Sequence, residues 1–125
     1  MNPLTLEWIN KAEGDFATSK REYRVRKVPN YDAVCFHAQQ AAEKYIKAFL
    51  QEHDLEIPRT HNLTELVFIC RNVQPEMQLL SEYLNFLDGF AVNYRYPGIS
   101  AERSDAKIAI HAIEAVRDYF KSLLV

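Results

Sequence analysis

A line of polar side chains recurs at helical spacing between residues 37 and 51. Its members offer amide groups, one titratable ring and two ammonium groups: His37, Gln40, Lys44, Lys47 and Gln51. Residues three or four apart lie on one face of a helix. Such a face is either solvated surface, which is the common case, or one wall of a groove that binds an anion.

An arginine between two aromatic residues is the second candidate, in the segment Tyr94-Arg95-Tyr96-Pro97. A guanidinium can donate two hydrogen bonds to one phosphate, and the flanking rings can stack on bases. The same guanidinium could instead bridge backbone carbonyls of its own loop. The residue chemistry leaves both interpretations open.

Cationic residues gather near the end of the first expected helix: Lys20, Arg21, Arg24, Arg26 and Lys27. Such a cluster could bind phosphates. Cations at the C-terminal end of a helix also complement its dipole, and we favour this structural role.

His61 stands between Thr60 and Asn62, two residues able to cap the next helix. Its imidazole either braces the loop through a hydrogen bond, which is the favoured interpretation, or faces a ligand.

The spacing of the histidines argues against a metal site. Carboxylate bundles that bind metals use glutamate and histidine three residues apart, and no glutamate here has that neighbour. Three glycines provide no phosphate-binding glycine loop, and no serine lies in a nucleophile-elbow motif. We therefore expect neither a metal nor a cofactor.

The overall charge limits where a nucleic acid can bind. With a net charge of −2 the chain has no global positive field, so nucleotide or RNA binding requires a local site. The first residues resemble no signal peptide, and no segment reaches membrane-spanning length. We expect a cytoplasmic protein without membrane contact.

Apolar residues recur at helical spacing along the chain, and no strand-like alternation is sustained, which indicates an all-α protein. The short connections favour an antiparallel up-and-down bundle of four to five helices, forming one domain over residues 1–125. We expect a first helix from about Leu4 to about Arg26 and a second that has Asn30 as its N-cap and ends near Asp54. A short third helix should span residues 63–70. A fourth should run from Pro75 to Gly89 or Phe90, and the last should begin between Ser100 and Ser104.

Several stripes predict the core. The second helix carries the apolar line Val34, Ala38, Ala41, Ala42, Tyr45 and Phe49. For the last helix we expect the line Ile108, Ala112, Ala115, Val116, Tyr119 and Leu123. Cys35 and Cys70 lack any framework spacing, so we expect two buried, reduced thiols.

Four segments, taken in order, resemble the HEPN domain, the nucleotide-binding domain of higher eukaryotes and prokaryotes. They are Trp8 with Ala12 and Asp15, the stretch 31–48, Thr60-His61-Asn62-Leu63, and Tyr94-Arg95-Tyr96-Pro97. Together they span nearly the whole chain. The resemblance implies an antiparallel bundle that forms a homodimer and acts beside a minimal nucleotidyltransferase in toxin–antitoxin or other defence systems.

Several HEPN proteins are metal-independent ribonucleases in which four to six residues separate an arginine from a following histidine. The resemblance assigns that arginine to Arg95. The positions at those spacings hold Ser100, Ala101 and Glu102, and none of them can act as an imidazole does in acid–base catalysis.

The leading hypothesis is a HEPN module that binds a nucleotide or RNA phosphate. Its expected site consists of Arg95, Tyr94, Tyr96, His37, Gln40, Lys44, Lys47 and His61. One alternative is a divergent ribonuclease toxin that uses His37 or His61, and another is a helical interaction module without a ligand.

Overall fold

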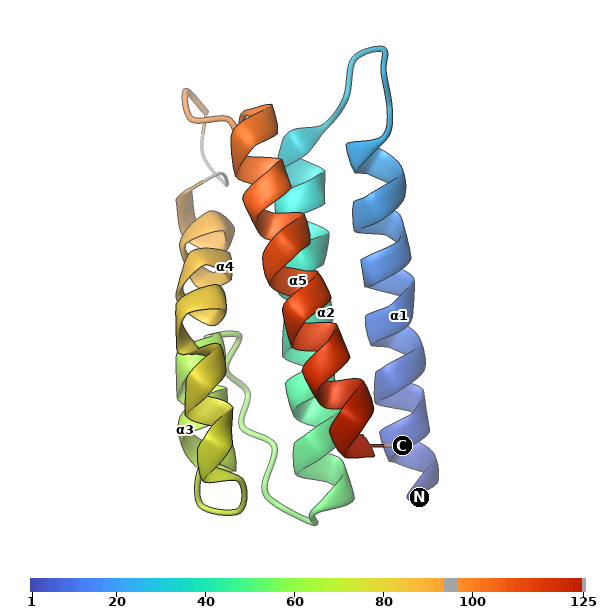
Figure 1. Cartoon of the computed structure of the whole chain (residues 1–125), viewed down its shortest axis with the longest axis vertical. Helices are drawn as coiled ribbons and strands as arrows, with labels where there is room; N and C mark the ends of the chain where they lie inside the picture. Colours follow the sequence, from blue (N-terminus) through green and yellow to red (C-terminus); the bar gives the residue numbers. More distant parts are fainter. Residues whose placement is uncertain (94–96, 125) are drawn as a thin grey trace.

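The computed structural model describes residues 1–93 and 97–124, and within them it contains α-helices and one short 3-10 helix but no strand (Figure 1). This confirms the predicted all-α bundle. The elements are α1 (Pro3–Tyr23), α2 (Tyr31–Glu52), α3 (Leu63–Cys70), η1 (Pro75–Leu80), α4 (Ser81–Asn93) and α5 (Arg103–Leu124).

Asparagine side chains cap the N-termini of the first three helices. Asn2 accepts a hydrogen bond from the Leu4 amide at 2.8 Å, and Asn62 accepts one from Glu65 at 2.9 Å. Asn30 caps α2 by accepting from Ala33 at 3.0 Å, as predicted. Each cap satisfies a backbone amide that the first helical turn leaves free.

Two boundaries differ from the predictions. Helix α1 ends at Tyr23, three residues before the expected Arg26. The segment expected to be one helix from Pro75 begins instead as the 3-10 helix η1, and α4 then continues to Asn93. Proline suits the tight first turn because its amide has no hydrogen to donate.

Helix α2 is the centre of the molecule. It packs against α1 in the largest helix–helix interface and also contacts α5, α4 and α3. Its predicted apolar stripe is buried from Val34 to Phe49. The Phe120 ring of α5 lies 6.4 Å, between centroids, from both the Tyr45 and the Phe49 rings of α2. The core surrounds α2 and takes residues from all the other helices.

The predicted stripe of the last helix is rotated relative to the observed one. Ala112 and Val116 are buried as expected, but Ile108 is 42% exposed. The buried line follows Ala109, Ile113, Val116, Phe120 and Leu124. Helix α5 contacts α1, α2 and α4, and these three neighbours together decide which of its residues are buried. A single line of apolar residues in the sequence does not specify that choice.

The two cysteines are buried and unpaired, as predicted. Burial raises the pKa of the Cys35 thiol to about 12, and that of Cys70 likewise to about 12. Both thiols are therefore protonated and poor nucleophiles at neutral pH. Among the helices that the structure describes, none is both long and apolar enough to cross a bilayer.

The two ends of the bundle differ in what they carry. The α1–α2 connection, the end of α4 and the start of α5 lie at one end, whereas both chain termini lie at the other (Figure 1). We call the former the connection end.

Candidate functional site

The predicted polar line of α2 faces α1. The His37 Nδ1 atom lies 2.8 Å from one carboxylate oxygen of Asp15, and the Lys44 ammonium donates to the other. Since a carboxylate only accepts, Nδ1 carries the hydrogen and Nε2 is left as the acceptor in the neutral ring. Two predicted binding residues are thus paired with Asp15 inside the chain.

A second carboxylate holds Lys47 and His61. Lys47 donates to Glu43 at 3.1 Å and is itself buried, and its ammonium lies 5.7 Å from the centroid of the Trp8 ring. The His61 Nδ1 atom lies 3.0 Å from the other oxygen of Glu43, while the side chain is 74% exposed. The predicted loop-bracing contact of His61 therefore exists, and much of its ring faces solvent.

Gln40 is linked to the same loop through its neighbour. The Gln40 amide donates to the Gln39 side-chain oxygen at 2.8 Å, and Gln39 donates to the backbone carbonyl of His61 at 3.0 Å. His37 and Lys44 therefore fasten α1 to α2 through Asp15. Gln40 and Lys47 bond within α2 to Gln39 and Glu43, the two residues that hold His61 of the 55–62 connection.

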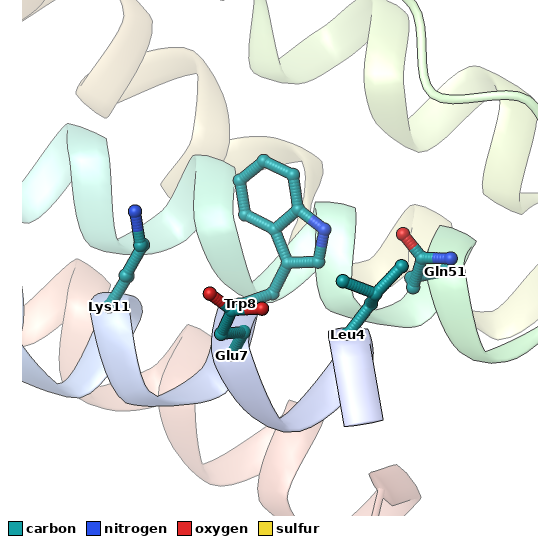
Figure 2. Close-up of a pocket in the computed structure, with 5 residues that line it drawn as sticks. All are labelled: Leu4, Glu7, Trp8, Lys11 and Gln51. Atoms are coloured by element: carbon teal, nitrogen blue, oxygen red, sulfur yellow. The ribbon is translucent and has the colours of Figure 1, made fainter. Parts of the chain in front are cut away.

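A hollow of about 250 Å³ lies at the Gln51 end of this line (Figure 2). Trp8 extends from α1 toward α2, with Leu4 and Gln51 to one side of its ring and Lys11 to the other. Glu7 and Lys11 contribute one charge of each sign. Such a lining suits a flat apolar group and lacks the convergent cations that a phosphate requires.

An ion pair that the sequence pattern did not indicate joins α1 to α5. Arg117 donates from two nitrogens to the two oxygens of Glu13, each at 2.9 Å, and the Tyr45 hydroxyl donates to Glu13 at 2.6 Å. Burial raises the pKa of Glu13, but the hydrogen bonds from Arg117 and Tyr45 outweigh it and hold that pKa below its usual value. The sequence shows only a glutamate and an arginine 104 residues apart, which does not predict that they form an ion pair.

The predicted cationic cluster lies at the connection end. Lys20 is 3.6 Å from Glu114 of α5, and Lys20 and Arg24 line a hollow of about 350 Å³ between α1 and α5. Arg24 and Arg26 line a neighbouring hollow of about 590 Å³. Lys20 and Arg21 also occupy the last turn of α1, where cations complement the helix dipole.

Tyr94, Arg95 and Tyr96 lie outside the described residues. The described flanks of their segment are Asn93, where α4 ends, and Pro97. Farther along the connection, the Ala101 amide donates to Asp32 in the first turn of α2 at 2.6 Å. This bond ties the approach to α5 to the start of α2. Across residues 1–93 and 97–124, no three histidine, cysteine or acidic side chains are grouped to hold a metal ion.

The fold is an antiparallel helical bundle in which the central helix α2 is fastened to α1 by the Asp15 carboxylate with His37 and Lys44. The family model described as "HEPN domain" matches residues 5–123. The chain therefore belongs to the HEPN-domain family, which confirms the resemblance.

Solved structures share this fold. An archaeal HEPN homologue is 22% identical with a TM-score of 0.75, and the alignment covers 97% of this chain and 98% of that one. The TT1696 protein of Thermus thermophilus is 21% identical with a TM-score of 0.77, and the alignment covers 96% of this chain and 98% of that one. No curated protein matches the chain.

Proposed function

We propose that this HEPN protein binds a nucleotide or RNA phosphate at the connection end of its bundle. One observation carries the proposal: five cationic side chains and a single carboxylate line two adjoining hollows there, although the whole chain has a net charge of −2. A local concentration of positive charge is what phosphate binding requires in an acidic protein.

Arg95 is the proposed principal donor to the phosphate, and Tyr94 and Tyr96 are proposed to stack on a base. The segment that contains them joins α4 to α5, and both helix ends lie at the connection end (Figure 1). His37, Gln40, Lys44, Lys47 and His61 are proposed to support the site. His37 and Lys44 hold α1 against α2 through Asp15, His61 bonds to Glu43 of α2, and Gln40 and Lys47 bond to neighbouring residues of α2.

The proposal includes a homodimer that acts with a minimal nucleotidyltransferase in a toxin–antitoxin or defence system, as family membership favours. An exposed apolar line supports the dimer. Leu79, Tyr83 and Phe86 recur at helical spacing along η1 and α4, and each is exposed. A second copy that covers them would remove this surface from water.

The first test is binding of RNA and of mononucleotides by wild type and Arg95→Ala, measured by fluorescence anisotropy and calorimetry in chelator. Loss of a charge-assisted phosphate contact should weaken binding by about tenfold to a hundredfold. Arg59→Ala removes an exposed arginine from the connection between α2 and α3 and should leave affinity unchanged. Equal affinity in Arg95→Ala, with helicity intact, would remove Arg95 from the site.

The ribonuclease alternative has one specific observation in its favour. Both His37 and His61 are oriented by a carboxylate, an arrangement that general bases use. The same protein preparations should therefore be incubated with structured and single-stranded RNA. Binding without cleavage supports the binding module, whereas cleavage lost in His37→Ala or His61→Ala would replace it with a ribonuclease.

A further inference from the structure

Two rows of cations face each other across the seam between α1 and α5. Lys20 lies in the last turn of α1, and Arg24, four residues later, is the C-cap of that helix with helical backbone dihedrals, so the two project from the same side. On α5 the residues Arg103, Lys107 and His111 repeat at the same interval. With a rise of 1.5 Å per residue, the α5 row extends over about 12 Å.

The two hollows at this seam adjoin, and we call them together the α1–α5 track. Lys20, Lys107 and His111 line the first, Arg26 and Arg103 line the second, and Tyr23 and Arg24 line both. The Arg103 guanidinium lies 5.9 Å from the centroid of the Tyr23 ring, at the junction. The cations therefore continue from one hollow into the next instead of converging on one point.

Most of the positive charge in this track is not neutralised. Lys20 is paired with Glu114, whereas within the described residues neither Arg24 nor Lys107 forms an ion pair with a carboxylate. Five cations and one carboxylate give the track a formal charge of +4 with His111 neutral. Since the whole chain carries −2, the remaining residues carry −6.

The size and lining of the track indicate the class of ligand. A mononucleotide site encloses its base in one largely apolar pocket with a few polar groups. Here the two hollows measure about 350 and 590 Å³, and each is lined by three cations. Tyr31 adds an aromatic side chain to the second hollow, where a base can stack.

We propose that the α1–α5 track binds consecutive phosphates of single-stranded nucleic acid, so that the ligand of this protein is an oligonucleotide. The inference rests on the proposed function and adds a second contact region, on residues separate from Arg95. Arg24, which lines both hollows, and Lys107, which lies across the seam on α5, make the phosphate contacts.

The test compares Arg24→Gln/Lys107→Gln with the matched double variant Lys11→Gln/Arg59→Gln. Both lower the net charge by the same amount, but Lys11 and Arg59 do not line the track. Binding is measured over a series of salt concentrations. The ligands are a short and a longer oligouridylate, the corresponding oligodeoxyuridylate, UMP and polyglutamate. Circular dichroism confirms the folding of each variant.

We expect wild type to bind the longer oligouridylate more tightly than the short one and far more tightly than UMP. Each phosphate contact to a single strand contributes about 0.7 to the slope of log K against log salt, so the track variant should lose about 1.4 from that slope. The matched variant should keep the wild-type slope. Tighter binding of oligouridylate than of oligodeoxyuridylate would indicate contacts to the 2'-hydroxyl groups as well. Equal affinity for the two would indicate that the protein recognises the phosphates.

The outcomes separate the two proposals. Wild-type salt slopes in both double variants, together with weakened binding in Arg95→Ala, would overturn the track and leave the proposed function. UMP binding as tight as oligonucleotide binding, or polyglutamate binding of equal strength, would also overturn the track. Absence of any nucleotide or nucleic-acid binding by wild type would overturn both proposals.

Discussion

Glu13 is a carboxylate that two other helices contact. It accepts two hydrogen bonds from Arg117 of α5 and one from Tyr45 of α2, so one side chain of α1 connects three helices. The Arg117 guanidinium also lies 4.6 Å from the centroid of the Phe16 ring. Hydrogen bonds to charged groups contribute more to stability than neutral ones.

Glu13→Gln should lower the free energy of unfolding at pH 7 by about 1–3 kcal/mol. Because the folded-state pKa of Glu13 lies below its ordinary value of 4.5, the carboxylate stabilises the fold fully above that pH. The contribution is lost as the pH falls through the folded-state pKa. The stability gap between wild type and variant should therefore narrow in acid.

Urea denaturation at a series of pH values measures this gap. Glu7→Gln is the matched control, since Glu7 is an exposed glutamate of the same helix. A gap that stays constant from neutral pH to strong acid would show that the Glu13 charge is not the source of the stabilisation.

The candidate residues on α2 show what the sequence can and cannot predict about a site. Helical spacing correctly placed His37, Gln40, Lys44 and Lys47 on one face. The spacing is the same whether that face meets water, a ligand or another helix. The deciding information is the position of Asp15, 22 residues from His37 along the chain.

Helix α3 is short and depends on contacts at its start. It spans eight residues, and isolated helices of this length are not stable in water. Asn62 supplies a local cap. Asp88 of α4 supplies a second cap by accepting from the amides of Leu63 and Thr64 at 2.9 and 3.2 Å.

Asp88→Ala should destabilise the protein by about 1–2 kcal/mol, because two backbone amides at the start of α3 lose their acceptor. Hydrogen exchange of the α3 amides should increase more than exchange in α2. Asp118→Ala removes an exposed carboxylate from α5 and should change neither measurement. Unchanged exchange in α3 would mean that Asn62 alone is a sufficient cap.

At the scale of elements, local signals predicted well and distant ones did not. The Asn30 cap, the range of α3 and the buried stripe of α2 follow from neighbouring residues. The register of α5 does not, because Ile108 and Ala109 are both apolar and only the packing of three helices selects the buried one. No residue near the start of α3 in the sequence predicts the Asp88 cap, because Asp88 lies 25 residues from Leu63.

The exposed apolar line on η1 and α4 gives a prediction for the whole molecule. Leu79 is 79% exposed, and Tyr83 and Phe86 follow it on the same face. We expect the wild type to sediment as a dimer and Leu79→Glu/Phe86→Glu to sediment as a monomer with unchanged helicity, because charges resist burial in an interface.

Leu6→Glu/Ile108→Glu is the control for that experiment. It places two glutamates at exposed apolar positions on α1 and α5, away from the line, and should leave the dimer intact. Dissociation of both double variants, or a monomeric wild type, would contradict the assignment of this face.

The uneven distribution of charge has a consequence for encounters in solution. With +4 in the α1–α5 track and −6 elsewhere, the molecule carries a large electric dipole directed toward the connection end. Near a polyanion such a dipole orients the protein so that the track faces the polyanion and the acidic surface faces away from it. The same segregation turns the acidic surface away from phosphates, so encounters of this weakly acidic protein with a nucleic acid favour the orientation in which the track comes first.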